Sequence, residues 1–189
     1  MAGCRQLSRF FLFMAGSCAL AAVTVNGWPA AQRERNAMQL TSTAFSEGHP
    51  IPTKHTCDGQ DASPPLKWGG APAATKTLAL IADDPDAPAG TWVHWVLWNL
   101  PAGTTELAEG LPRSESLPNG GKQGVNDFKR SGYGGPCPPA GKPHRYFFKV
   151  YALDIPLELK ADATKKEVER AMIGHILAQG QLMGTYQRR

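Results

Sequence analysis

The sequence predicts a single β-dominated domain that carries one helix near its C-terminal end. The chain has 189 residues, 42% of them apolar, which suffices for one hydrophobic core of ordinary domain size. Its 20 glycines and 16 prolines exceed average usage and cluster between short apolar runs. This distribution is typical of short strands joined by turns, so we expect an all-β-dominated fold.

The N-terminal region predicts a secretory signal peptide. Arg5 and Arg9 precede an apolar stretch at 10–25 that contains no acidic residue. This stretch is shorter than a membrane-spanning helix, which needs about 20 residues, so an uncleaved membrane anchor is the less favoured alternative. We assign residues 1–27 to the signal peptide, with cleavage near Gly27, and expect an exported protein, either periplasmic or secreted.

The charge of the remaining chain argues against nucleic-acid binding. Loss of residues 1–27 removes two basic residues and no acidic one, which lowers the formal net charge from +4 to +2. Lys and Arg are scattered rather than gathered in a stripe, unlike a nucleic-acid interface. We interpret residues 28–37 as a polar linker and residues 38–189 as the domain.

Two cysteines, Cys57 and Cys137, remain after removal of the signal peptide. In an oxidising compartment they can form one disulfide, but their spacing leaves two separate thiols as an equal alternative. A metal site that combines them with His55 and His144 is disfavoured, because the pair spacings are not those of a zinc site. We expect neither a metal nor a cofactor.

Alternation and apolar runs predict the strands. Residues 38–45 alternate apolar side chains with Thr or Ser and are expected to form an edge strand. Residues 46–72 are rich in Gly, Pro and Asp, which predicts a wrapping loop with one short strand. Continuous apolar runs predict buried strands at 75–82 and 92–100, and a third long strand is expected at 144–154.

The pleat of a strand sorts its side chains between two faces. In the 92–100 strand, strict alternation places four side chains on one face: Trp92, His94, Val96 and Trp98. The opposite face holds Val93, Trp95, Leu97 and Asn99. In the 144–154 strand, one face holds His144, Tyr146, Phe148, Val150 and Ala152, and the wetter face holds Arg145, Lys149 and Tyr151. We therefore expect His94 among aromatic side chains.

A helix is predicted by a capping box in which Thr164 is the N-cap and Glu167 lies three residues later. An apolar stripe with helical spacing follows at Val168, Met172 and Ile176. We expect Gly180 to end this C-terminal helix.

Two proline-containing segments are candidates for a functional site. Asp84 lies in a rigid turn, 83–88, at the end of a buried strand, where the scaffold holds side chains still. Alternatively, Asp84 and Asp86 only bond backbone amides in an Asx-turn. The loop 102–143 has no sustained periodicity, and loops of this length are usually functional or disordered. The stiff, Gly- and Pro-rich stretch 134–139 at its end favours a functional loop.

Two histidines and a tyrosine complete the candidate set. His94 alone would be interpreted as a core histidine, but His144 and Tyr146 begin a strand after the loop and share one face, so we expect the three in one cavity. Imidazole and phenol groups donate hydrogen bonds to phosphate-like oxygens, and the glycines at 134–135 would let backbone amides approach closely. Asp84 beside a histidine would orient its ring and raise its pKa, which favours the charged form that binds anions.

Four ordered motifs resemble the phosphatidylethanolamine-binding protein family, in its bacterial Raf-kinase-inhibitor-like branch. In chain order the motifs are Asp84-Pro85-Asp86-Ala87-Pro88, Trp92-Val93-His94-Trp95, Gly135-Pro136-Cys137-Pro138-Pro139 and His144-Arg145-Tyr146. The resemblance covers residues 38–189, including Cys57-Asp58-Gly59 and the C-terminal helix.

The resemblance implies a Greek-key sandwich of two antiparallel sheets and a non-catalytic pocket that accepts phosphate or phosphorylethanolamine-like groups. The residues that match the family's pocket are Asp84, His94, His144 and Tyr146. Gly135 and Pro139 match the rim of that pocket. Pro88 matches a proline whose peptide bond is usually cis in the family. Trp92, in the motif of His94, is also a candidate binding residue. The C-terminal sequence differs from that of eukaryotic members, so no pocket role is transferred to Tyr186.

Two other functions compete with small-ligand binding. An inhibitor of a kinase or protease would contact its partner through the loop 102–143 and capture a phosphorylated or acidic side chain in the pocket. A hydrolase would use His94 or His144 as a base and Asp84 to orient it, but no G-x-S-x-G motif supplies a nucleophile. We expect a non-enzymatic binding protein for a small anionic or phosphoryl ligand, and a homodimer is compatible with the sequence.

Overall fold

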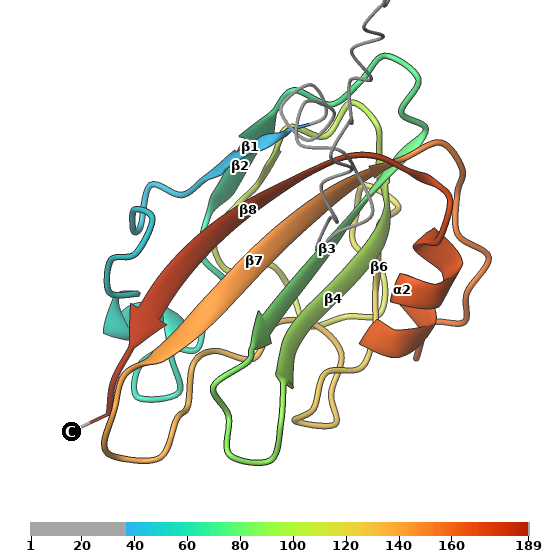
Figure 1. Cartoon of the computed structure of the whole chain (residues 1–189). Helices are drawn as coiled ribbons and strands as arrows, with labels where there is room; N and C mark the ends of the chain where they lie inside the picture. Colours follow the sequence, from blue (N-terminus) through green and yellow to red (C-terminus); the bar gives the residue numbers. More distant parts are fainter. Residues whose placement is uncertain (1–36, 189) are drawn as a thin grey trace, which may run out of the picture.

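The computed structural model describes residues 37–188, which form two antiparallel sheets and one helix (Figure 1). The large sheet has the strand order β6-β4-β3-β7-β8, and the small sheet has the order β1-β2-β5. This arrangement confirms the predicted fold class. The predicted signal peptide at 1–27 and residues 28–36 of the predicted linker lie outside the described residues.

The three long strands predicted from the sequence are found close to the expected residues, whereas the predicted edge strand is shorter than expected and the strand at Ile176–Tyr186 was not predicted. The small sheet consists of β1 (Gln39–Thr41), β2 (Leu66–Gly69) and β5 (Glu106–Leu107). The large sheet consists of β3 (Thr77–Asp84), β4 (Trp92–Pro101), β6 (Lys122–Gln123), β7 (His144–Leu153) and β8 (Ile176–Tyr186). The remaining elements are a 3-10 turn, η1 (Thr53–His55), and the helix α2 (Lys165–Met172).

The main hydrophobic core lies between the two sheets. Leu40 of β1 and Trp68 of β2 belong to the same buried cluster as Leu80 of β3 and Phe148 of β7. A second apolar cluster covers the opposite face of the large sheet, where α2 packs through residues such as Val168. The central strands are therefore buried on both faces, which explains why their sequences read as continuous apolar runs.

The helix α2 ends earlier than predicted. It begins with the expected capping box, in which the backbone N–H of Thr164 donates to Glu167 Oε2 at 2.8 Å. It ends at Met172, because Gly174 has a φ of +82°, a conformation that stops a helix and that glycine adopts without strain. The assignment of Ile176 and Gly180 to the helix was wrong, since both lie in β8. The burial of β8 alternates with the period of a strand at Ala178, Gly180, Leu182 and Gly184.

A bulge in β4 breaks the predicted alternation at His94. Ala82 pairs with Trp95 and Asp83 pairs with Val93, so His94 is the extra residue of the bulge. Val96 belongs to the cluster on the α2 side of the sheet. His94 instead contacts Tyr146, which lies in the core between the sheets. The prediction that His94 and Val96 share a face was therefore wrong.

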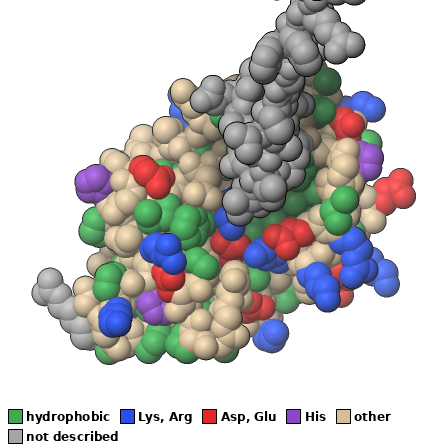
Figure 2. Space-filling model, in the orientation of Figure 1, with side chains coloured by type: hydrophobic (Ala, Val, Ile, Leu, Met, Phe, Trp, Pro, Cys, Tyr) green, Lys and Arg blue, Asp and Glu red, His purple; other side chains and the backbone are tan. Residues whose placement is uncertain are grey.

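Charged side chains of both signs are interspersed over the surface shown in Figure 2. Several of them form ion pairs, such as Arg145 with Asp86 and Lys54 with Glu109. No helix within residues 37–188 is long and apolar enough to cross a membrane.

Candidate functional site

A pocket of about 200 Å³ lies at the end of the large sheet where β3 ends and β4 and β7 begin. Its walls come from the β3–β4 turn, from β4 and β7, and from the long loop. They consist of Asp84, Ala87, Pro88, Trp92, His94, Phe128, Cys137, Pro138, Pro139 and His144. Most of these side chains are apolar, so polar recognition falls to one carboxylate and two imidazoles. This volume suits a small ligand.

Most of the predicted binding residues meet in this pocket. The lining includes Asp84, Pro88, Trp92, His94, Pro139 and His144. Tyr146 and Gly135, which were also predicted, are not part of the lining. The side chains converge because β3 pairs with both β4 and β7, which brings the ends of three strands together.

Asp84 orients His144 directly. Its Oδ2 accepts a hydrogen bond from Nδ1 of His144 at 2.8 Å, and both side chains are buried. A carboxylate only accepts, so the imidazole proton sits on Nδ1, and Nε2 is left for a molecule in the pocket. The other carboxylate oxygen of Asp84 accepts the N–H of Asp86 at 2.8 Å. The Asx-turn and the orienting role, which were posed as alternatives, are therefore both present.

His94 is held by the backbone of Gly134. Its Nδ1 donates to the carbonyl oxygen of Gly134 at 2.6 Å, while the Gly134 N–H donates to the carbonyl of His94 at 2.9 Å. Burial lowers the pKa of His94, although the Gly134 carbonyl and the Asp84 charge act in the opposite direction. Asp84 therefore acts on the pKa of His94 in the expected direction, but burial outweighs it, so the net shift does not favour the charged form. In its neutral form, this ring leaves Nε2 as a hydrogen-bond acceptor.

Phe128 is a wall residue that the sequence did not reveal. Its ring lies edge-on to those of His94 and Trp92, with centroids 5.4 Å and 5.5 Å away. The guanidinium of Arg130 covers it at 5.4 Å from the centroid. The loop that carries Phe128 also contains Tyr133 and several leucines, so no pattern in the sequence singles out Phe128 as a wall residue.

Tyr146 does not line the pocket but packs against His94, which does. The side chain is only 2% exposed, and its ring lies edge-on to His94 with a centroid separation of 5.2 Å. Burial, together with the nearby Asp84 carboxylate, raises the pKa of Tyr146, so the phenol stays neutral. Its hydroxyl has no hydrogen-bond partner among the described residues.

Gly135 does not offer its amide to a ligand. Its N–H donates to Oδ1 of Asp61 at 2.6 Å, and the neighbouring N–H of Gly134 is taken by His94. The predicted anion contact through glycine amides was therefore wrong, because both donors already have partners within the protein.

Pro88 lines the pocket with a trans peptide bond. No peptide bond within residues 37–188 is cis, so the cis geometry implied by the resemblance is not found at Pro88. The turn closes instead through a hydrogen bond from the N–H of Gly90 to the carbonyl of Ala87 at 3.1 Å.

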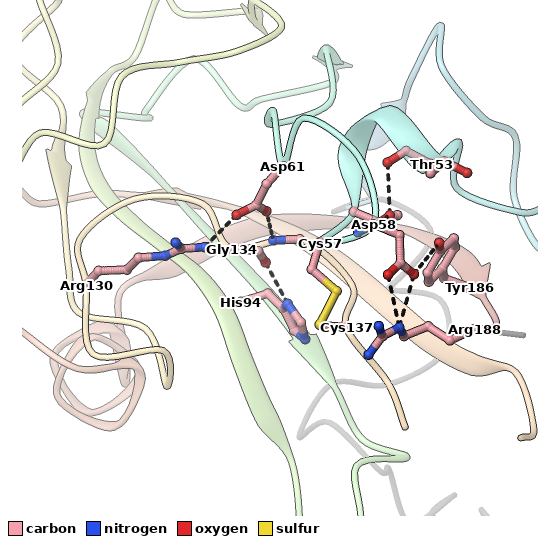
Figure 3. The surroundings of a disulfide bond; sticks show 12 residues. Thr53, Cys57, Asp58, Asp61, His94, Arg130, Gly134, Cys137, Tyr186 and Arg188 are labelled. Atoms are coloured by element: carbon pink, nitrogen blue, oxygen red, sulfur yellow. Dashed lines mark hydrogen bonds and ion pairs between the residues drawn. A yellow bond between two sulfur atoms is a disulfide. The ribbon is translucent and has the colours of Figure 1, made fainter. Parts of the chain in front are cut away.

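The rim segment, residues 134–139, is tied to the rest of the domain by a disulfide (Figure 3). Cys137, a lining residue, is bonded to Cys57, with the two Cα atoms 5.4 Å apart. The disulfide occupies both sulfurs of the metal site that was considered from the sequence, which also included His55 and His144. Within residues 37–188 no cluster of three or more His, Cys, Asp or Glu side chains is placed to hold a metal ion.

The chain is similar to proteins from archaea and bacteria. Residues 41–187 match a family model described as phosphatidylethanolamine-binding protein. A UPF0098 protein of Methanothermobacter thermautotrophicus is 50% identical over 151 residues, which cover 80% of this chain and 99% of the relative. A UPF0098 protein of Aquifex aeolicus is 50% identical over 153 residues, covering 80% of this chain and 89% of the relative.

Solved structures agree with this match. A crystal structure of a phosphatidylethanolamine-binding protein homologue from Chlamydia trachomatis shares 45% identity, with a TM-score of 0.74 and coverage of 82% of this chain and 99% of that one. YbcL of Escherichia coli, described as a member of the mammalian family, shares 36% identity, with a TM-score of 0.76 and coverage of 80% and 99%.

Proposed function

Since the chain belongs to the phosphatidylethanolamine-binding protein family, we propose that it is an exported binding protein whose pocket accepts a small phosphoryl group, without turnover. One observation carries this proposal. Two buried imidazoles, His94 and His144, each commit Nδ1 to a fixed acceptor and so keep Nε2 for a ligand. They do so in a pocket of about 200 Å³ with apolar walls.

A phosphoryl group that carries one negative charge and a P–OH group complements these two nitrogens. Neutral His94 accepts a hydrogen bond from a P–OH group at Nε2, and a His144 ring that carries a second proton would donate from Nε2 to a charged oxygen. The pocket lining includes the Asp84 carboxylate and neither Lys nor Arg, which disfavours a ligand with two negative charges. We therefore expect weak binding that strengthens as the pH falls.

The same lining supports binding without catalysis. A hydrolase that uses His94 or His144 as a base to activate a side-chain nucleophile needs a hydroxyl or thiol within reach. The residues around the pocket include no Ser or Thr, and the sulfur of Cys137 is bonded to Cys57. That disulfide also supports export, because disulfides persist in oxidising compartments.

Titration calorimetry with inorganic phosphate and phosphorylethanolamine, at about pH 6 and about pH 8, tests this function. We expect heat of binding that is stronger at the lower pH and that His144→Gln abolishes. His175→Gln is the matched control, because His175 forms a similar bond of 2.9 Å with Asp154 but does not line the pocket. No heat at either pH would contradict the proposal.

A further inference from the structure

Each histidine of the pocket is connected to a carboxylate, but the connection to His94 passes through a peptide group. Asp84 contacts His144 directly. For His94, the acceptor is the carbonyl of Gly134, and the N–H of that same peptide group, which belongs to Gly135, donates to Oδ1 of Asp61 (Figure 3). A single peptide group therefore lies between the Asp61 carboxylate and the His94 ring.

Asp61 is fixed from several directions. Its Oδ2 accepts hydrogen bonds from Arg113 at 2.5 Å and from Arg130 at 2.6 Å. Its backbone has a φ of +53°, a left-handed conformation that is uncommon outside glycine, and its N–H donates to the carbonyl of Thr56 at 3.2 Å. Its side chain is 18% exposed. These contacts hold the Asp61 carboxylate in place beside the rim segment.

The close approach of the peptide to Asp61 requires glycine at position 135. A Cβ atom on Gly135 would lie 2.4 Å from the carbonyl oxygen of His55 and 2.8 Å from Oδ1 of Asp61. Both distances are shorter than real Cβ contacts. Any larger residue would therefore push the peptide away from the carboxylate.

The two hydrogen bonds of this peptide reinforce one another. A carboxylate that accepts from the N–H polarises the peptide group, which makes its carbonyl oxygen a better acceptor. The carbonyl then holds the proton of His94 on Nδ1, at a distance of 2.6 Å. Without the carboxylate, the carbonyl would be an ordinary peptide acceptor.

We propose that Asp61 is a positioning residue of the pocket: through the Gly134–Gly135 peptide it fixes His94 with its proton on Nδ1 and its Nε2 free to accept a hydrogen bond from the ligand. The ligand part of this statement rests on the proposed function. It deepens that function, because an acceptor at Nε2 favours phosphate, which carries a proton near neutral pH, over sulfate, which does not. We expect phosphate to bind about ten-fold more tightly than sulfate.

Nitrogen NMR of the His94 ring, recorded on the disulfide-bonded protein without ligand, tests the positioning role. The wild-type protein should show Nδ1 protonated and Nε2 unprotonated. In Asp61→Asn, the neutral amide can still accept from Gly135 but polarises the peptide less, so protonated Nε2 should appear. Phosphate affinity should fall about ten-fold, as is typical when a group that orients a binding residue is lost.

Asp58→Asn is the matched control. Asp58 lies on the same loop and accepts hydrogen bonds from Tyr186 at 2.8 Å and Arg188 at 3.1 Å. It does not bond the Gly134–Gly135 peptide, so this variant should leave both the His94 signals and the phosphate affinity unchanged. An equal effect of Asp58→Asn and Asp61→Asn would show a general loosening of the loop and would overturn the proposal.

The readouts separate this proposal from the proposed function. Failure of wild-type protein to bind phosphate would refute the binding function, whereas the ring signals are read without ligand and decide the role of Asp61 independently. Protonated Nε2 in the wild-type protein would overturn the proposal without any variant. An unchanged His94 ring in folded Asp61→Asn would overturn it as well.

Discussion

Oδ2 of Asp84 lies 2.8 Å from Nδ1 of His144, although 60 residues separate them in the chain. The contact exists because β3 and β7 are neighbours in the large sheet, so the end of one strand meets the start of the other. The second oxygen of Asp84 closes the turn through Asp86. One side chain thus sets both the shape of a pocket wall and the orientation of a ring within the pocket.

Asp84→Asn should impair binding more than folding. The amide can still accept from the N–H of Asp86, but its NH₂ group would face Nδ1 of His144 and favour the proton on Nε2. We expect phosphate affinity to fall about ten-fold or more and the free energy of unfolding to change by about 1 kcal/mol. Calorimetry and urea denaturation on the same preparation measure both, and equal affinity in variant and wild type would contradict the role of Asp84.

Asp86 should titrate well below an ordinary aspartate. Hydrogen bonds from the Arg145 side chain lower its pKa from 3.8 to about 2. The unfolded chain therefore takes up this proton at a higher pH than the folded chain. The stabilisation by Asp86 is complete above pH 3.8 and is lost as the pH falls towards 2. In an NMR titration, Arg145→Gln should move the pKa of Asp86 up towards 3.8; an unmoved titration would show that Arg145 is not the cause.

Burial of His94 should make the fold sensitive to mild acid. Its pKa is lowered from 6.5 by desolvation, so the unfolded histidine binds a proton at a pH where the folded one does not. This contribution to stability is complete above pH 6.5 and declines as the pH falls below that value. The free energy of unfolding, measured in buffers without phosphate, should fall less steeply with acid in His94→Gln. Parallel slopes for variant and wild type would contradict the shift.

The disulfide should contribute strongly to stability, because Cys57 and Cys137 are 80 residues apart in sequence. Closing a loop of this length restricts the unfolded chain and stabilises a fold by about 4 kcal/mol. The double variant Cys57→Ser, Cys137→Ser should therefore unfold at lower denaturant concentration and lose phosphate affinity, since Cys137 lines the pocket. Wild-type protein in reducing buffer should behave in the same way, and identical denaturation curves would rule this out.

Regular alternation predicted β7 correctly but failed in β4, and the difference has a physical cause. The faces of β7 follow the pleat, so the position of Tyr146 on the core side could be read from the sequence. In β4 a bulge inserts His94, and because both faces of that strand are apolar, no change in pattern marks the inserted residue. The bulge also directs this ring towards the pocket, a common use of bulges near sites.

The C-terminal end of α2 could not be predicted from the sequence, because the residue pattern there fits both a helix and a strand. Ile176 follows Met172 by four residues, which fits a helix, but it also begins the alternation of β8. Gly174 was the correct stop signal, and only its left-handed backbone distinguishes it from Gly180 as a helix end.

The candidate site was predictable where it rests on ordered motifs and not where it rests on contacts between loops. Asp84, His94 and His144 lie in segments that carry recognisable residue patterns. Phe128 and Asp61 lie in two irregular loops, and no sequence periodicity predicts where these loops run. For the same reason the sequence suggested free glycine amides in the rim segment, whereas the structure pairs them within the protein.

A crystal structure of the protein soaked in phosphate at about pH 6 would show whether the pocket binds a phosphoryl group. We expect one phosphate in the pocket, with its oxygens within hydrogen-bond distance of Nε2 of both His94 and His144. Phosphate bound only at surface Lys or Arg side chains, with water in the pocket, would contradict this expectation.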